Sequence, residues 1–154
     1  MVALGRGLLT DPFWTKKVEE GQRKKIRPCI GCHDGCMGRI MMGRPLSCTV
    51  NPLAGRERSY AIEKTNRPKK VMIIGGGIAG LEAARTAALR GHQVTLSERQ
   101  RVLGGWLVPG SIPSFKKALG DLLEWYKSDL QELRVEIRLG IEGTPRFLED
   151  ANPD

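Results

Sequence analysis

The sequence predicts an α/β fold in which a partial parallel sheet, in the order β-α-β-α-β, follows an irregular cysteine-rich segment. Three observations lead to this prediction. Short apolar runs alternate with longer amphipathic ones from residue 71 onward, and a glycine-rich turn, GGGIAG at 75–80, separates the first run from the second. All four cysteines lie ahead of this region, within residues 29–48.

The first 27 residues are expected to hold a short strand over 2–4 (VAL), a Gly-Arg turn at 5–6 and a charged helix near 11–21. Asp11 is the expected N-cap of that helix, because an aspartate before a proline is a frequent helix start. Residues 28–68 contain several glycines and prolines and little periodicity. We expect them to form a loop-built module with one short helix at most.

The remaining residues, 69–154, carry the periodic pattern. The expected strands are 71–74, 92–98 and 134–140, and the expected helices are 78–91 and 113–133. A strand-helix-strand order implies parallel neighbours joined by right-handed crossovers. No further strand is expected after residue 140.

The formal net charge is +8, and most of the positive excess lies before the sheet, around the cysteines. A basic surface suits nucleic acid, but no aromatic residue between 15 and 59 offers a stacking platform for bases. Phosphate groups or an anionic metal cluster are the alternative partners, and we expect no nucleic acid. The apolar runs are too short to cross a membrane, and the first residues lack a secretory pattern, so a cytoplasmic location is expected.

The glycine-rich turn is the first candidate site. Gly75, Gly77 and Gly80 match the G-x-G-x-x-G pattern of Rossmann-like dinucleotide-binding folds. The first glycine permits a tight turn, the second lets the backbone approach a pyrophosphate, and the third lets the helix pack on the strand. N–H groups at the amino end of the helix favour the phosphates. The two positions inside the pattern are Ile78 and Ala79.

Glu98 ends the second expected strand, at the distance from the turn that a ribose-binding acid takes. Its carboxylate would accept hydrogen bonds from an adenosine ribose and would disfavour a 2′-phosphate, although Arg99 and Arg101 lie nearby. We expect an ADP-containing cofactor with Arg99 beside it, and FAD, ADP and NAD stay open. A glycine turn in another kind of α/β protein is the alternative.

The second candidate site is a metal site with the spacing C-x2-C-x3-C-x11-C, formed by Cys29, Cys32, Cys36 and Cys48. Clustered cysteines in a reducing setting bind metal more often than they form disulfides. Structural zinc sites usually take two separate cysteine pairs. Here three ligands share one tight loop, which favours a 4Fe–4S cluster, and zinc stays open as the alternative.

The residues around these cysteines suit a cluster loop. Glycines that allow the loop to curl are Gly31, Gly35 and Gly38. Basic residues that we expect to offset the negative charge of a cluster are Arg27, Arg39 and Arg44. His33 lies between ligands, but four thiolates already suffice, so we expect it to be a solvated loop residue.

Two stretches together resemble one family: RPCIGCHDGC…LSCTVNP, and KKVMIIGGGIAGLEAARTAALRGHQVTLSERQRVLGGWL. Both are similar to the trimethylamine dehydrogenase and 2,4-dienoyl-CoA reductase branch of the old yellow enzyme family. The start, VALGRGLLTDPFW, is similar to the last strand and helix of that family's FMN-binding TIM barrel. The resemblance implies that Gly104 and Gly105 lie near the dinucleotide, and that Gly5 and Arg6 bind FMN phosphate.

The resemblance also divides the chain. It implies the end of a barrel at 1–27, a 4Fe–4S segment and linker at 28–68, and an incomplete FAD- or ADP-binding domain at 69–154. In the intact family, electrons pass between FMN, the cluster and FAD or an external carrier, during enoyl reduction or amine oxidation. The expected partners are therefore a flavin or adenine nucleotide and the remaining segments of a longer enzyme.

We expect the chain to be the middle of such an enzyme, with no catalytic residue of its own and no complete activity. It would serve as the electron-transfer portion of a flavin- and iron–sulfur-dependent oxidoreductase. Two alternatives remain: a zinc-stabilised basic binding module, and a truncated fragment without function. The sequence predicts neither a substrate nor an oligomeric state.

Overall fold

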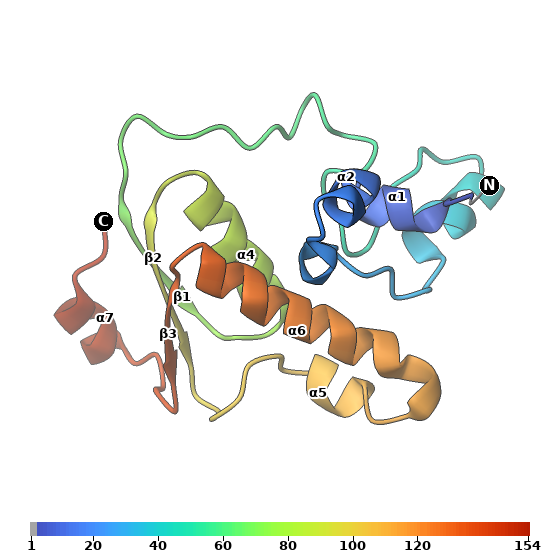
Figure 1. Cartoon of the computed structure of the whole chain (residues 1–154). Coiled ribbons are helices and arrows are strands. Elements are labelled where there is room, and N and C mark those ends of the chain that lie inside the picture. Colours follow the sequence, from blue (N-terminus) through green and yellow to red (C-terminus); the bar gives the residue numbers. More distant parts are fainter. Residues whose placement is uncertain (1–2) are drawn as a thin grey trace.

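The computed structural model describes residues 3–154. Its centre is a parallel sheet in the order β1-β2-β3, formed by Lys70–Ile74, Gln93–Glu98 and Glu136–Leu139 (Figure 1). The register places Ile73 beside Leu96 and Leu96 beside Ile137, so three apolar side chains form one row across the sheet. The predicted α/β class with a partial parallel sheet is confirmed.

The core lies between one face of this sheet and two helices, α4 (Ile78–Leu89) and α6 (Lys117–Glu132). In Figure 1 both helices lie on the same side of the strands. Apolar side chains of the strands and of the two helices pack together there, because the strand period of two and the helix period of 3.6 each place them on one face. The fully buried members of this core include Leu81, Ala84, Leu96 and Leu130.

Two helices of this region were not predicted. α7 (Pro145–Ala151) lies on the other side of the sheet from α4 and α6 (Figure 1). It begins with a favourable cap, because the Thr144 hydroxyl accepts a hydrogen bond from the N–H of Phe147 and Pro145 occupies the first turn. α5 (Leu107–Gly110) is a single turn, followed by the 3-10 turn η3 (Ser114–Lys116) that leads into α6.

The start of the chain differs from the prediction. Two short helices, α1 (Arg6–Thr10) and α2 (Trp14–Glu19), stand where one helix near 11–21 was expected, and a 3-10 turn, η1 (Arg23–Lys25), follows them. Arg6 therefore begins a helix rather than forming a turn. Ala3 and Leu4 are not in a strand, and the first residue of the predicted strand, residue 2, lies outside the described residues.

Asp11 explains the break between the two helices, because its backbone is extended (φ −136°, ψ 99°). One carboxylate oxygen accepts from the N–H of Phe13. The other accepts from the Lys17 ammonium at 2.6 Å and from the N–H of Arg27 at 2.9 Å. Asp11 thus ties this segment to the start of the cysteine region instead of capping a longer helix.

The cysteine region is mostly irregular, as expected. It contains a short π-helix, η2 (Asp34–Gly38), that continues into one turn of α-helix, α3 (Arg39–Met41).

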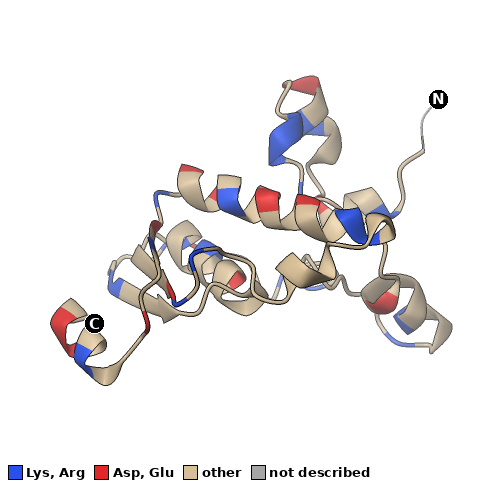
Figure 2. Cartoon of the chain, turned by 90° about the horizontal axis from the view of Figure 1, so that it is seen from below, with Lys and Arg blue, Asp and Glu red and all other residues tan. Residues whose placement is uncertain are grey.

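Along the long helix α6, acidic and basic residues both occur, so this helix does not carry the positive excess (Figure 2). Within residues 3–154, no helix is both long and apolar enough to cross a membrane.

Leu81 offers a test of the core. Its side chain is fully buried on α4, so Leu81→Ala should lower the free energy of unfolding by about 2–5 kcal/mol. Ile112→Ala is the matched control, since Ile112 is 79% exposed and should change stability by less than about 0.5 kcal/mol. Urea unfolding followed by circular dichroism measures both. Equal losses in the two variants would contradict this packing.

Candidate functional site

The turn between β1 and α4 is shaped for a close ligand. Gly75 has φ +102°, and its N–H donates to the carbonyl of Ser97 at 2.7 Å, which holds the turn against β2. Gly77 precedes the first residue of α4, and a Cβ built there meets no atom within 4 Å. The backbone at Gly77 is therefore open to a ligand at the amino end of a helix.

The third glycine of the motif has a packing role. A Cβ on Gly80 would lie 1.9 Å from the carbonyl oxygen of Gly75. No side chain fits in that space, so the first turn of α4 can lie against the loop only with glycine at this position. Ile78 and Ala79 connect the open glycine to this close contact within the same turn of helix.

The Gly104–Gly105 turn packs against the same loop. Gly104 has φ +119° and donates its N–H to the carbonyl of Gly76 at 2.8 Å. Gly105 has φ +51°, and a Cβ there would lie 3.2 Å from the Cα of Gly77. The structure thus brings two glycine-rich segments together, although about 30 residues separate them in the sequence.

Glu98 ends β2 beside this loop and is 9% exposed. Its carboxylate accepts hydrogen bonds from the N–H groups of Gly76 at 2.6 Å and Gln100 at 2.8 Å. The acid therefore already supports the loop backbone, a role that the sequence did not suggest. Each carboxylate oxygen has two lone pairs, so capacity for a ribose hydroxyl remains.

A pocket lies at the carboxyl edge of the sheet, where ligands bind in open parallel sheets. It encloses about 570 Å³, including space open to solvent. Gly75, Glu98 and Arg99 line it. Three residues that follow β3 close its other side: Ile141, Glu142 and Gly143. The structure thus brings Arg99 together with the glycine loop and the acid.

All four cysteines line a second pocket, which encloses about 310 Å³, including space open to solvent. All four are free thiols. Eight further residues complete the lining: Arg6, Leu9, Thr10, Ile30, His33, Gly35, Thr49 and Val50. The loop with three cysteines and the later fourth cysteine are therefore brought to one place, which a four-thiolate site requires.

Gly35 explains how the fourth cysteine reaches the loop. The N–H of Ser47 donates to the carbonyl of Gly35 at 2.8 Å. A Cβ on Gly35 would lie 2.9 Å from the Cα of Cys48, so only glycine permits this approach. The backbone of Gly35, next to Cys36, thereby lies against that of Cys48.

Hydroxyl groups surround the sulfurs. Thr49 Oγ1 lies 2.9 Å from Cys32 Sγ, and Thr10 Oγ1 lies 3.8 Å from Cys48 Sγ. Four thiolates form the donor set of iron–sulfur clusters and of structural zinc alike, so the residues present fit either group by donor type. Within residues 3–154, no three His, Cys, Asp or Glu side chains are grouped as for a single metal ion.

The basic residues near the cysteines do not lie where we expected. Of the expected Arg27, Arg39 and Arg44, none is among the lining residues of the cysteine pocket. Arg39 donates to the carbonyl of Pro45 instead. Arg6 lines the pocket, and its NH1 lies 2.6 Å from Nε2 of His33, which is therefore a contact residue as well as an exposed one.

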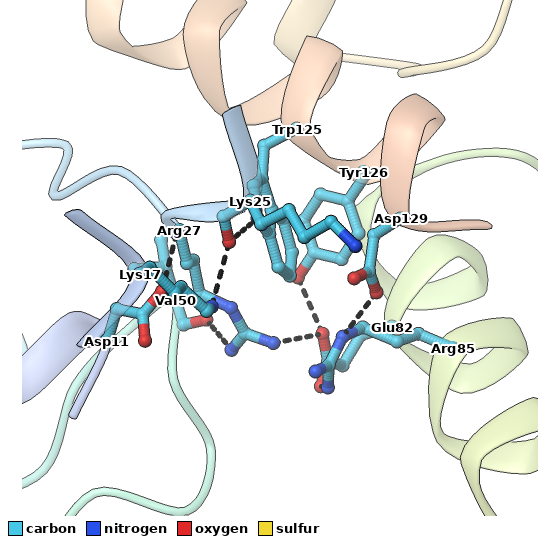
Figure 3. A network of polar contacts seen from close by, with 10 residues as sticks. All are labelled: Asp11, Lys17, Lys25, Arg27, Val50, Glu82, Arg85, Trp125, Tyr126 and Asp129. Carbon is cyan, nitrogen blue, oxygen red and sulfur yellow. Dashed lines mark hydrogen bonds and ion pairs between the residues drawn. The ribbon is translucent and has the colours of Figure 1, made fainter. Parts of the chain in front are cut away.

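Arg27 joins the cysteine region to the sheet domain (Figure 3). Its side chain is 6% exposed, and its guanidinium donates to the carbonyl of Val50. The same group lies 3.5 Å from a carboxylate oxygen of Glu82 on α4 and 4.5 Å from the ring centre of Trp125 on α6. Burial lowers the pKa of Arg27, and the Glu82 carboxylate opposes that shift.

The partners of Arg27 are themselves held in place. The Tyr126 hydroxyl donates to Glu82 at 2.7 Å, and burial raises the pKa of this tyrosine, which keeps it a donor. Arg85 bridges Glu82 and Asp129. The indole N–H of Trp125 donates to the carbonyl of Lys25 at 3.0 Å. The segment that leads into the cysteine region is thus fastened to α4 and α6.

A family model for FAD dependent oxidoreductases matches residues 70–152, the region that contains the glycine loop, Glu98 and the Gly104–Gly105 turn. This match covers more than half of the chain. The chain belongs to the FAD-dependent oxidoreductase family. The predicted resemblance is consistent with this family.

Relatives match the chain over its whole length. It is 46% identical over 154 residues to a cinnamate reductase of Clostridium sporogenes, covering 100% of this chain and 23% of the relative. It is 44% identical over 155 residues to an NADH oxidase of Thermoanaerobacter brockii, covering 99% and 24%. The solved structure of a 2-naphthoyl-CoA reductase complex matches with a TM-score of 0.94 at 33% identity, covering 97% and 23%.

Amine dehydrogenases also occur among the relatives. Reductases and amine dehydrogenases together confirm the predicted branch and the prediction of an oxidoreductase segment. This FAD-dependent oxidoreductase chain spans about a quarter of the length of the curated relatives it matches.

Arg27→Met tests the contact by which Arg27 fastens the cysteine region to α4 and α6, called the joint below. The substitution removes the buried guanidinium from Glu82 and from the carbonyl of Val50, while Arg85 still contacts Glu82. Breaking a buried pair costs about 3–5 kcal/mol when no other cation remains, so we expect a loss of about 2–3 kcal/mol here. Lys25→Met is the control, because the Lys25–Glu132 pair is 45% and 47% exposed and should contribute less than about 1 kcal/mol. Denaturant unfolding gives both values. If the two variants lose the same stability, Arg27 is not the joint.

Proposed function

We propose that this chain is the electron-transfer part of a flavin- and iron–sulfur-dependent oxidoreductase. One observation carries the proposal: all four cysteines line one pocket, and Arg27 fastens that region to the domain that belongs to the FAD-dependent oxidoreductase family. Residues 28–68 would hold a 4Fe–4S cluster, and residues 69–154 would hold the ADP part of FAD. Residues 1–27 would belong to a neighbouring FMN domain.

The cysteine pocket supports the first half of this proposal. Cys29, Cys32, Cys36 and Cys48 would ligate the cluster, which accepts and donates single electrons when bound. The protein contributes a close backbone contact at Gly35, which brings the segment with Cys48 to the loop next to Cys36. The hydroxyl of Thr49 lies at the sulfur of Cys32, where it can donate a hydrogen bond to thiolate.

The glycine loop supports the second half. The open backbone at Gly77 and the amino end of α4, including Ile78 and Ala79, would bind the pyrophosphate. Glu98 would accept from the ribose while it supports the loop, and Arg99 would line the adenosine side of the site. The Gly104–Gly105 turn would bound the pyrophosphate on the opposite side.

The activity of the whole enzyme is proposed on the relatives. Reductases and amine dehydrogenases both occur among their names, and the 46% identity to a cinnamate reductase favours enoyl reduction. Substrate chemistry would take place outside this chain, at an FMN whose phosphate Gly5 and Arg6 would bind. Electrons would pass between that FMN and FAD, or an external carrier, through the cysteine pocket.

Cys36→Ala tests the cluster. Anaerobically reconstituted chain should contain iron and sulfide and absorb broadly near about 400 nm, as thiolate-bound clusters do. Loss of one of four ligands should lower iron and sulfide per chain and destabilise the loop, whose order depends on the metal. Met37→Ala, a change of an exposed neighbour, should leave both unchanged. Bound zinc without sulfide would contradict the cluster.

Gly77→Val tests the nucleotide site. The backbone at Gly77 is extended (φ −74°, ψ 178°), so valine fits there without strain, but its side chain would occupy the space for the pyrophosphate. ADP affinity should fall at least about tenfold, which corresponds to about 1.4 kcal/mol. Ala83→Val places the same side chain on an exposed position of α4 and should not affect binding. Calorimetric titration that shows equal affinity in both folded variants would exclude this site.

A further inference from the structure

Arg6 holds a fixed position at the cysteine pocket. It begins α1, and the carbonyl of Arg6 accepts a hydrogen bond from the Thr10 hydroxyl at 3.1 Å. The Asn51 amide donates to the carbonyl of Leu9 at 2.8 Å, which fastens α1 to the segment that follows Cys48. The side chain of Arg6 lines the pocket with the cysteines and contacts His33. Its place there therefore depends on several contacts made by its own helix.

The pocket contains little other charge besides the thiols. Among its lining residues, Arg6 carries the one permanent positive charge, and no carboxylate lines the pocket. Arg27 does not line it and is buried against Glu82 and Trp125. Arg39, which is close to the cysteines in sequence, is bonded to the carbonyl of Pro45. Arg6 is thus the permanent cation that lines the site of the thiolates.

We propose that Arg6 raises the reduction potential of the cluster in the cysteine pocket. The inference rests on the cluster proposed above and adds a role for a residue outside the cysteine region. One-electron reduction adds a negative charge to a group that four thiolates already make anionic. A guanidinium beside it stabilises the reduced form more than the oxidised form, because Coulomb attraction grows with that charge. Charge and surrounding polar groups are established determinants of cluster potential.

This role is separate from the FMN phosphate contact that the family resemblance implies for Arg6. A guanidinium offers five N–H donors, so a phosphate on one side and the cysteine pocket on the other can share it. Arg6 is a residue that sets the properties of the cluster, not a catalytic residue. Its effect is therefore measurable in this chain without substrate or FMN.

The experiment is a reductive titration of reconstituted chain with dithionite and redox mediators, in which each cluster takes up one electron. Bleaching of the visible absorption gives the midpoint potential. Arg6→Gln should shift it to more negative values at full iron content, and Arg6→Lys should restore most of the wild-type value. Arg39→Gln is the matched control and should leave the potential unchanged, because Arg39 does not line the pocket.

Salt provides a readout that a structural role would not move. Arg6 is exposed, so added salt should screen its charge and shrink the difference between wild type and Arg6→Gln. An unchanged potential in Arg6→Gln with full iron and sulfide overturns the inference and leaves the cluster intact. Wild-type chain that binds no iron and sulfide overturns the cluster and the role of Arg6 with it.

Discussion

The arrangement of this chain depends on one buried guanidinium. Arg27 loses most of its water, and such a cation is tolerated only where a carboxylate and further hydrogen-bond acceptors surround it. Glu82, the carbonyl of Val50 and the face of Trp125 provide these contacts, from three different segments. Because Arg27 and Val50 flank the cysteines, one side chain both closes the cysteine region and fastens it to the sheet domain.

This joint relates the two candidate sites to each other. α4 starts at the open glycine of the nucleotide loop and carries Glu82 on its second turn. The cysteine pocket lies on the other side of the joint, between Arg27 and Val50 along the chain. One helix thus carries the nucleotide loop at its amino end and the contact to the cysteine region in its second turn.

The sequence predicted the features that depend on local pattern. The strands, the two core helices and the glycine turn follow from periodicity and from backbone requirements at Gly75 and Gly80. The errors arose where distant residues decide the outcome. Asp11 was expected to cap a helix, but its carboxylate accepts hydrogen bonds from the Lys17 ammonium and from the N–H of Arg27. The ribose contact of Glu98 stays a prediction, but the hydrogen bond that its carboxylate accepts from the N–H of Gly76 was not predicted. A local sequence pattern does not predict hydrogen bonds between residues that are far apart in the chain.

Arg27 and Arg6 show in the same way that sequence proximity does not predict which charge lies at the cysteine pocket. Arg27 is two residues from a cysteine, and proximity in sequence favours it as the cation that offsets a cluster. Its charge is instead neutralised by the carboxylate of Glu82, which lies 3.5 Å away within a buried network. Arg6 is far away in sequence, lines the pocket, and forms none of the ion pairs found within residues 3–154. Arg27, which is paired with Glu82, therefore stabilises the structure. Arg6, which forms no such ion pair, contributes the positive charge of the pocket.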